Sequence, residues 1–191
     1  MRKKLRFTIH LYNVIKMNAF EILMKTSADA KHKGKTKNGF AIYKGSAVDD
    51  SECYLLQFDG GAVPNPGEAS GGAVLFGPGG RKLLAERGEY LSHATNNQAE
   101  YTGIYIGVKY ALEIGVRNIM IEGDSKLVIS QLEGTFKVKN EGLKELYICV
   151  KELLDKFEFV ALRHVLRDKN AHADRLTDEV IEGKASFTRK F

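Results

Sequence analysis

The sequence of 191 residues predicts an α/β fold, a mixed five-stranded sheet with helices on both faces. Two observations support this fold class. Three mainly apolar runs between residues 53 and 91 are joined by short loops rich in Gly and Pro, which is typical of three antiparallel meander strands. After residue 97, segments with helical spacing alternate with two short apolar runs, and strand–helix–strand units imply that those two strands are parallel.

Composition and charge indicate one folded domain with a basic extension. Apolar residues make up 43% and charged residues 28% of the chain, which is ordinary for a globular protein, and no apolar run is long enough to span a bilayer. Residues 1–50 hold eleven Lys and Arg against four Asp and Glu, a balance of +7, whereas residues 51–191 hold eighteen against twenty, a balance of −2. We therefore expect a basic N-terminal extension at 1–50, either flexible or targeting, a folded domain at 51–183 and a polar C-terminal tail at 184–191.

The three meander strands are predicted at 53–59, 71–76 and 82–91. Gly and Pro follow the first of them, and Pro cannot donate to a sheet ladder, so this strand is expected to end at Asp59. A carboxylate at the end of a core strand is costly unless something pairs with it, which makes Asp59 a candidate metal ligand. The Gly-rich segment 77–80 is expected to form a hairpin turn.

The second half of the chain predicts helices and strands in alternation. Glu100, Gly103 and Gly107 share one stripe of the first helix, and glycines on a packed stripe indicate that this helix lies close against the sheet. Ser125 is a favourable N-cap for the next helix. The expected elements are a helix at 97–115, a strand at 116–122, a helix after Ser125, a helix at 143–157, a strand at 159–166 and a helix at 170–181.

Four carboxylates stand at the ends of these elements. Asp59 and Asp124 follow two strands, and Glu100 and Asp174 lie in the first turns of two helices. The carboxyl ends of strands form the ligand crevice of open α/β sheets, so Asp59 and Asp124 are expected to face each other if their strands are neighbours. Clustered oxygen ligands favour Mg²⁺ or Mn²⁺, and two such ions assist in-line phosphoryl displacement. Because no Ser–His–Asp or Cys–His arrangement is visible, the cluster predicts a nuclease or a phosphotransferase.

Each of these carboxylates also has an ordinary structural explanation. Glu100 is suited to be the third-position partner of Asn97 in a capping arrangement, and Asp124 and Asp174 are favourable charges at helix starts. Taken singly, each residue is better explained by structure than by catalysis. Their occurrence at four element ends favours a shared metal site instead.

The motifs around the four carboxylates resemble those of the type 1 ribonuclease H family. They occur in the family's order and spacing from about Tyr54 to about Glu182, and the plant and archaeal branch is the most similar. The resemblance implies metal-dependent endonucleolytic cutting of the RNA strand of RNA–DNA hybrids, which leaves a 3′-hydroxyl and a 5′-phosphate. The motifs are Phe58-Asp59-Gly60-Gly61, Asn65-Pro66-Gly67, Thr95-Asn96-Asn97-Gln98-Ala99-Glu100, Gly123-Asp124-Ser125 and Asn170-Ala171-His172-Ala173-Asp174-Arg175-Leu176.

The resemblance also implies roles for individual residues. The family uses two Mg²⁺ ions, with Mn²⁺ able to substitute, and the 2′-hydroxyl distinguishes RNA from DNA in the minor groove. The implied catalytic metal ligands are Asp59, Glu100, Asp124 and Asp174. The implied nucleic-acid contacts are Gly60, Gly61 and Gln98 for the RNA strand and Asn65, Thr95 and Asn96 for the DNA strand.

Two features depart from the family pattern. Many bacterial relatives have a catalytic histidine in a longer loop before the last helix, whereas here His164 falls within a predicted strand and His172 within the helix. His164 is therefore better explained as a strand residue than as a general acid. The basic segment that some relatives have between their middle helices is reduced to Lys137 and Lys139. Hybrid binding is then expected to be weaker or to depend on the basic extension.

Two other functions remain open at this point. One is a nucleic-acid-binding module of the same fold with little turnover, which four costly acidic residues argue against; the other is a related nuclease with a different substrate. We expect a monomer that acts on RNA–DNA hybrids and does not associate with a membrane. Cys53 and Cys149 predict buried free thiols and hence an intracellular location, in cytoplasm or nucleus, with a mitochondrion or plastid left open by the basic N-terminus.

Overall fold

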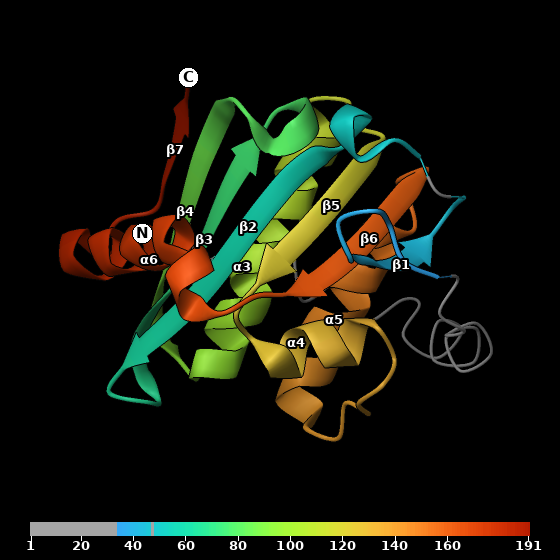
Figure 1. The fold of residues 1–191 in the computed structure, drawn as a ribbon. Helices are drawn as coiled ribbons and strands as arrows, with labels where there is room; N and C mark the ends of the chain where they lie inside the picture. The colour runs from blue at the N-terminus through green and yellow to red at the C-terminus, as the bar shows by residue number, and fades with distance from the viewer. Residues whose placement is uncertain (1–33, 47) are drawn as a thin grey trace. The chain divides into compact units, whose positions relative to one another are not determined.

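The computed structural model describes residues 34–46 and 48–191, which contain one mixed sheet with helices on both faces (Figure 1). The predicted α/β fold is confirmed, but within these described residues the sheet has seven strands rather than five, in the order β1-β6-β5-β2-β3-β4-β7. The strands are β1 (Ala41–Lys44), β2 (Tyr54–Val63), β3 (Gly67–Phe76), β4 (Leu83–Ala94), β5 (Asn118–Gly123), β6 (Phe159–His164) and β7 (Phe187–Lys190). The α-helices are α3 (Asn96–Glu113), α4 (Lys126–Leu132), α5 (Glu141–Leu154) and α6 (Ala171–Gly183), with short 3₁₀ helices η1 (Asp50–Glu52), η2 (Pro78–Gly80) and η3 (Arg167–Lys169).

The centre of the sheet has the predicted topology. Strands β2, β3 and β4 form an antiparallel meander, and β5 and β6 run parallel to β2. The first hairpin is longer than expected, because Gly60 and Gly61 continue the ladder opposite Gly71 and Ser70. The turn contains only residues 64–66, where Pro cannot donate to the ladder. Asp59 therefore lies within β2 rather than at its end.

Two edge strands extend the sheet beyond the boundaries predicted at residues 51 and 183. Strand β1 pairs antiparallel with β6, and β7 pairs antiparallel with β4. Phe40 and Ile42 are buried in a cluster with side chains of β5 and β6, so β1 also contributes to the core. Four-residue edge strands have too short a pattern to be predicted locally, since their pairing depends on a partner strand far along the chain. The predicted flexible or targeting character of the extension falls largely on residues 1–33, which lie outside the described residues.

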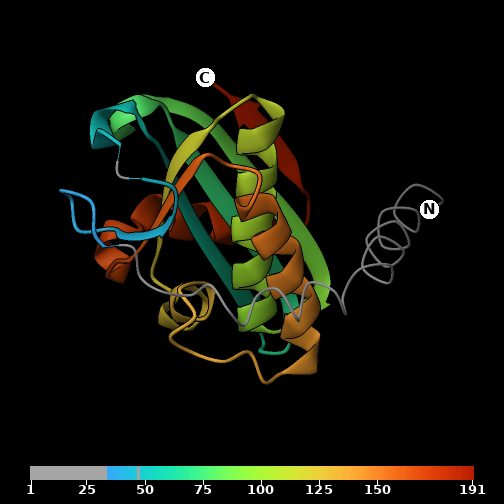
Figure 2. The same ribbon diagram turned by 90° about the vertical axis from the view of Figure 1, so that its right-hand side faces the viewer.

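Helices cover the two faces of the sheet unequally. Figure 2 shows α3 and α5 on one side, and α6 packs on the opposite face over β2, β3 and β4. A Cβ atom at Gly103 of α3 would lie 2.4 Å from the backbone oxygen of Asp59 and 2.8 Å from that of Gly72. This close approach is the reason for glycine in the helix stripe, as the sequence predicted, and it brings the start of α3 against β2.

The main core lies between α3, α5 and the sheet. Its largest fully buried side chains include Tyr101, Ile104 and Phe58. Cys53 is buried and Cys149 partly buried, and both are free thiols, as predicted. In the described ranges, no helix is both long and apolar enough to cross a membrane.

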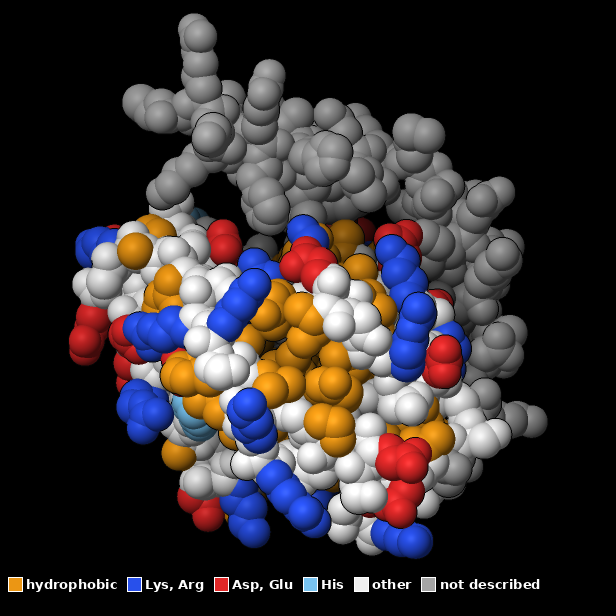
Figure 3. Space-filling view, turned by 90° about the horizontal axis from the view of Figure 1, so that it is seen from above, with side chains coloured by type: hydrophobic (Ala, Val, Ile, Leu, Met, Phe, Trp, Pro, Cys, Tyr) orange, Lys and Arg blue, Asp and Glu red, His pale blue; other side chains and the backbone are white. Residues whose placement is uncertain are grey.

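Figure 3 looks onto the end of the sheet where β2 and β5 begin. Lys and Arg surround a group of apolar side chains on this surface.

Candidate active site

Three of the four predicted carboxylates meet beside the middle of the sheet. Asp59 comes from β2, Glu100 from the first turns of α3, and Asp124 from the residue that follows β5. Strands β2 and β5 are parallel neighbours, and Phe58 lies opposite Gly123. The residues that follow these two, Asp59 and Asp124, are therefore brought side by side. One carboxylate oxygen of each residue lies within 4.8 Å of the others. This spacing is suited to oxygen ligands that share a cation.

Burial makes this cluster electrostatically costly without a cation. Asp59 is only 7% exposed, and its burial, together with the neighbouring charge of Asp124, raises its pKa to about 6. Burial, followed by the charges of Asp59 and Asp124, raises the pKa of Glu100 to about 9. Buried Oε2 of Glu100 has no hydrogen-bond partner among the residues that the structure describes. A divalent cation bound to these oxygens would supply the missing partner, so the residues present fit a metal site.

Asp174, the fourth predicted ligand, lies near this cluster without belonging to it. It stands in the first turn of α6 and forms an ion pair with Arg167, at 2.5 Å between Nη2 and Oδ1. Its charge nevertheless contributes to the raised pKa of Asp59. The pair is open to solvent, since the Arg167 side chain is 76% exposed. Exposed ion pairs are worth about 0–1 kcal/mol, so Arg167 holds Asp174 only weakly.

Two residues to which the sequence assigned no role contact the carboxylates from the α6 side: Asn170, which was noted only as part of a motif, and Thr177. Asn170, directly before α6, donates from Nδ2 to Asp124 Oδ1 at 2.9 Å. Thr177, one turn after Asp174, donates from Oγ1 to Asp59 Oδ2 at 3.0 Å. Both are almost fully buried. A polar residue on the inward stripe of a helix that already carries a candidate ligand is the signal that could have identified Thr177.

Glu122 is a further buried carboxylate near the cluster, and protein side chains already balance its charge. Glu122 is 4% exposed and lies two residues before Asp124 on β5. It pairs with Arg163 at 2.5 Å and accepts a hydrogen bond from Gln57 Nε2 at 2.8 Å. Because its charge has partners on both neighbouring strands, Glu122 is not a comparable metal ligand.

The residues predicted to contact DNA lie together where the β2–β3 hairpin meets the start of α3. Asn65 Oδ1 accepts a hydrogen bond from the backbone of Asn96 at 3.1 Å, and Asn96 Oδ1 accepts one from the backbone of Ala62 at 2.7 Å. Thr95 caps α3 by accepting from the backbone of Gln98 at 3.3 Å. These bonds fix the hairpin to the helix that carries Glu100.

The residues predicted to contact RNA are used differently by the fold. Gln98 completes the capping box, as its Oε1 accepts from the backbone of Thr95 at 2.9 Å, which leaves its amide nitrogen for other contacts. A Cβ at Gly60 would lie 2.1 Å from the backbone nitrogen of Glu100, so glycine is needed there for helix packing. Gly61 borders open space, with nothing within 4 Å of an added Cβ. Of the two glycines, only Gly61 therefore leaves room for a close approach from outside.

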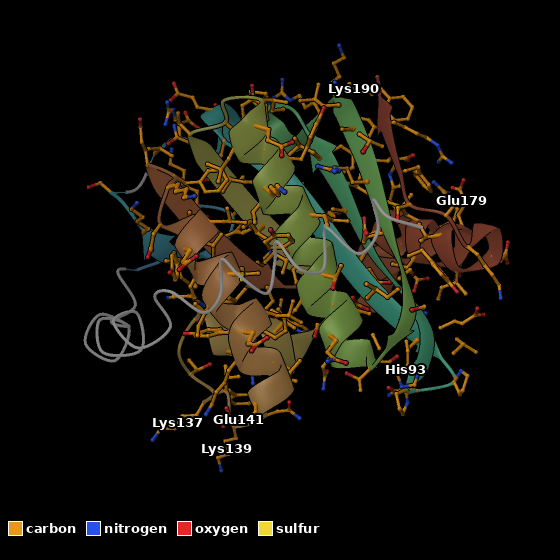
Figure 4. The ribbon with its side chains drawn as sticks, turned by 180° about the vertical axis from the view of Figure 1, so that it is seen from behind. His93, Lys137, Lys139, Glu141, Glu179 and Lys190 are labelled. Atoms are coloured by element: carbon orange, nitrogen blue, oxygen red, sulfur yellow. The ribbon has the colours of Figure 1, made fainter. Side chains whose placement is uncertain are left out.

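The two histidines have separate surroundings. His164 is the last residue of β6, as the sequence favoured, and its Nε2 lies 3.1 Å from the backbone oxygen of Asp124. His172 contacts Glu86 of β4 at 2.5 Å, which is not one of the four candidate ligands. Lys137 and Lys139 project from the loop before α5, at the lower edge of Figure 4.

A family model described as reverse transcriptase-like matches residues 57–180, which include all four carboxylates. The bifunctional protein Rv2228c of Mycobacterium tuberculosis is 36% identical over 131 residues, or 69% of this chain. The match covers only 36% of the length of that curated relative.

Solved structures of similar proteins match the fold as well as the sequence. RNase H1 from the archaeon Halobacterium salinarum is 35% identical, with a TM-score of 0.66, over 68% of this chain and 98% of that one. LC11-RNase H1, solved in complex with an RNA/DNA hybrid, is 30% identical, with a TM-score of 0.65, over 69% of this chain and 98% of that one. The sequence motifs, the sheet topology and these matches lead to one conclusion: the chain belongs to the reverse transcriptase-like family, as a member of type 1 ribonuclease H.

Proposed function

We propose that this chain is an endonuclease that hydrolyses the RNA strand of RNA–DNA hybrids with the help of divalent metal ions. The observation that carries the proposal is the cluster of Asp59, Glu100 and Asp124, whose oxygens lie within 4.8 Å of one another. Two of these carboxyl groups have raised pKa values and one has a buried oxygen without a partner in the described chain, which supports a cation rather than an ordinary structural role. RNase H1 relatives of similar fold support hybrids as the substrate.

The proposed site holds two Mg²⁺ ions, with Mn²⁺ able to substitute. Asp59, Glu100 and Asp124 form its centre. Asp174 would join them when a metal ion replaces Arg167 as its partner, which the weak, exposed ion pair permits. The chemistry that such ions supply when bound is activation of a water molecule and stabilisation of the leaving 3′-oxygen. The role of the protein is to hold the four carboxylates in place. Arg167, once released from Asp174, would place its positive charge near the phosphate of the cut strand.

The proposed hybrid lies across the hairpin and the start of α3. Asn65, Thr95 and Asn96 are proposed to face the DNA strand, and Gly61 and Gln98 the RNA minor groove. The bonds that tie Asn65 to Asn96, and Asn96 to Ala62, support this proposal because they preorganise the surface next to Glu100. Gly60 belongs to the same surface, although its lack of a side chain is explained by packing on α3.

A cleavage assay tests the proposal directly. The substrates are an RNA–DNA hybrid, single-stranded RNA, double-stranded RNA, an all-DNA duplex and a DNA duplex with a short run of ribonucleotides, each with Mg²⁺ or with a chelator. We expect cutting of the two substrates that pair ribonucleotides with DNA, and only with the metal. Equal cutting of free RNA would exclude recognition of two strands, and cutting of the all-DNA duplex would exclude recognition of the 2′-hydroxyl. Hybrid binding without cutting would identify a binding module instead.

The expectations that the enzyme acts as an intracellular monomer and without a membrane belong to this proposal too. The buried or partly buried free thiols of Cys53 and Cys149 support a reducing compartment. Light scattering of the purified chain would test the oligomeric state.

A further inference from the structure

We infer that Asn170 and Thr177 are positioning residues, which together clamp the two strand-borne carboxylates, Asp124 and Asp59, at a fixed separation. Both belong to the segment that enters and forms α6, so one element sets the geometry of ligands from two strands. The inference rests on the proposed function only in taking Asp59 and Asp124 as metal ligands. It does not depend on which substrate is cut.

Asn170 joins three parts of the site, two through its side chain and one through its backbone oxygen. Its Nδ2 group donates one hydrogen to the backbone oxygen of Phe58 at 2.8 Å and the other to Asp124 Oδ1 at 2.9 Å. Phe58 immediately precedes Asp59, and the backbone oxygen of Asn170 accepts from the backbone of Asp174 at 3.1 Å. The residue is fully buried, and both of its amide hydrogens are used. Its orientation is therefore determined, and with it the position of Asp124 relative to β2.

The orientation of Asn170 has a cost that points to this role. Its Oδ1 atom is buried and has no hydrogen-bond partner among the described residues. Turning the amide over would give Oδ1 to two acceptors, the Phe58 carbonyl and the Asp124 carboxylate, and would lose both bonds. An unpaired buried acceptor is unfavourable, because it has given up its hydrogen bonds to water. The fold tolerates this cost at an amide that contacts Asp124.

Thr177 acts on the second carboxylate. Its Oγ1 lies 3.0 Å from Asp59 Oδ2 and 2.7 Å from the backbone oxygen of Asp174. A hydroxyl has a single hydrogen, so it donates to one of these two acceptors at a time. Hydrogen bonds to an ionised group are the stronger ones, so Asp59 competes for this hydrogen although the Asp174 oxygen is nearer. A Cβ at Gly72 would lie only 2.9 Å from Thr177 Cγ2, which shows how closely this part of α6 packs on the sheet.

Together the two contacts keep one oxygen of each carboxylate occupied from the α6 side. The second oxygen of each carboxylate takes no part in these two hydrogen bonds, and one oxygen of each residue lies within 4.8 Å of the others and of Glu100. Outer partners of this kind fix the orientation of ligands, and their loss costs about 10–100-fold in metal affinity or activity. Neither residue touches the reacting phosphate in this arrangement, so both act through the ligands that they hold.

Four substitutions in the full chain test the inference. Asn170→Ala removes the amide. Thr177→Val keeps the volume and removes the hydroxyl, and Thr177→Ser keeps the hydroxyl. Asn140→Ala is the matched control, since Asn140 caps α5 through its side chain and loss of the cap lowers stability without touching the carboxylates. The measurements are Mn²⁺ affinity by calorimetry without substrate, kcat and KM on a hybrid at limiting Mn²⁺, and stability in urea.

We expect Asn170→Ala and Thr177→Val to weaken Mn²⁺ binding about 10-fold or more, and to lower kcat with KM for the hybrid within about twofold. Thr177→Ser should restore most of the affinity, and Asn140→Ala should lose stability but not affinity. Affinities of Asn170→Ala and Thr177→Val within twofold of the unsubstituted chain would overturn the inference. If Asn170→Ala does not fold, the comparison of Thr177→Val with Thr177→Ser decides.

The calorimetry separates this inference from the proposed function. If the chain and its variants bind Mn²⁺ with the expected pattern but the chain cuts no hybrid, the positioning role of Asn170 and Thr177 is supported and the proposed function is refuted. If the chain cuts hybrids but its Asn170→Ala and Thr177→Val variants bind Mn²⁺ normally, the proposed function is supported and the positioning role is refuted. Absence of Mn²⁺ binding by the unsubstituted chain would overturn both.

Discussion

At the scale of single residues, burial determines the chemistry of the carboxylates. Asp59 and Glu100 are shielded from water and lie beside Asp124, so their charged forms are unfavourable until a cation is bound. The same interaction gives the site its affinity, because a bound cation relieves the repulsion between the three groups. Stability and metal binding are therefore coupled at these residues.

Asp124→Asn tests the requirement for charge without changing shape. The new amide can still accept through its oxygen from Asn170, so the fold should be retained, whereas the charge that holds the metal is lost. We expect hybrid cleavage to fall more than about 100-fold, with an unchanged circular dichroism spectrum. A variant that keeps a tenth of the original rate would remove Asp124 from the site.

The raised pKa values predict that the metal-free protein becomes less stable as pH rises. Both acids are protonated in the folded and unfolded states below about pH 3, which is under the ordinary pKa values of Asp and Glu. On raising the pH, the unfolded chain releases its protons first, so folding stability falls until the pH passes the folded pKa values of about 6 for Asp59 and about 9 for Glu100. Above about pH 6 the loss comes mainly from Glu100.

Glu100→Gln checks this pH dependence. In urea unfolding with a chelator present, the variant should lose less stability than the unsubstituted chain between about pH 6 and about pH 9. Saturating Mg²⁺ should reduce the difference, because the cation stabilises the ionised carboxylate. Parallel stability curves for the two proteins over this range would show that Glu100 ionises normally.

At the scale of elements, the contact between α3 and β2 sets the position of Glu100 relative to Asp59. This contact depends on glycine at Gly103, where the helix touches the backbone of β2 and β3. The capping box of Thr95 and Gln98 then fixes where the helix begins. Local helix signals and close packing thus agree at the element that carries the ligand.

Gly103→Ala should force α3 away from the sheet. The added methyl would lie 2.4 Å from a backbone oxygen of Asp59, and backbone cannot give way as a flexible side chain can. We expect a loss of about 1–3 kcal/mol or more in the free energy of unfolding, together with weaker metal binding. Gly183→Ala is the control, because an added Cβ there meets nothing within 4 Å, and it should be neutral or stabilising. Equal stability of the two variants would contradict the close-packing argument.

At the scale of the whole molecule, the sheet depends on segments outside the family match. Strand β1 covers the β6 edge, and Phe40 and Ile42 close a small cluster with Met120 and Phe159. The family model begins only at residue 57. The region shared with relatives therefore carries the candidate site, and the flanking strands complete the sheet around it.

Two truncations test the contribution of β1. Removing residues 1–50 deletes β1 and exposes the cluster around Phe159, whereas removing residues 1–33 leaves every described residue in place. We expect the shorter chain, 51–191, to be less stable than 34–191 by several kcal/mol, since burying one Phe or Ile side chain contributes about 1.5–3 kcal/mol. Thermal and urea unfolding of both chains provide the comparison. Equal stabilities would show that β1 adds little to the fold.

The sequence by itself determined the meander, the parallel strands, the helix that carries Glu100 and the identity of the candidate ligands. These follow from local information: hydrophobic period, Gly and Pro at turns, a cap at Ser125 and the motifs around the carboxylates. The sequence placed Asp59 at the end of its strand, whereas it lies within β2. The helix stripe of Gly103 and Gly107 even predicted a close approach to the sheet, since glycine inside a helix is otherwise unfavourable.

Only the tertiary structure decided how those parts meet. The pairing of Asp174 with Arg167, and the hydrogen bonds from Asn170 and Thr177 to the carboxylates, depend on where α6 lies over β2, β3 and β4. Strands β1 and β7 pair with partners distant in the sequence, so their short patterns could not identify them. Local patterns specify which face or end a residue occupies, whereas contacts between distant segments depend on the packing of the whole sheet.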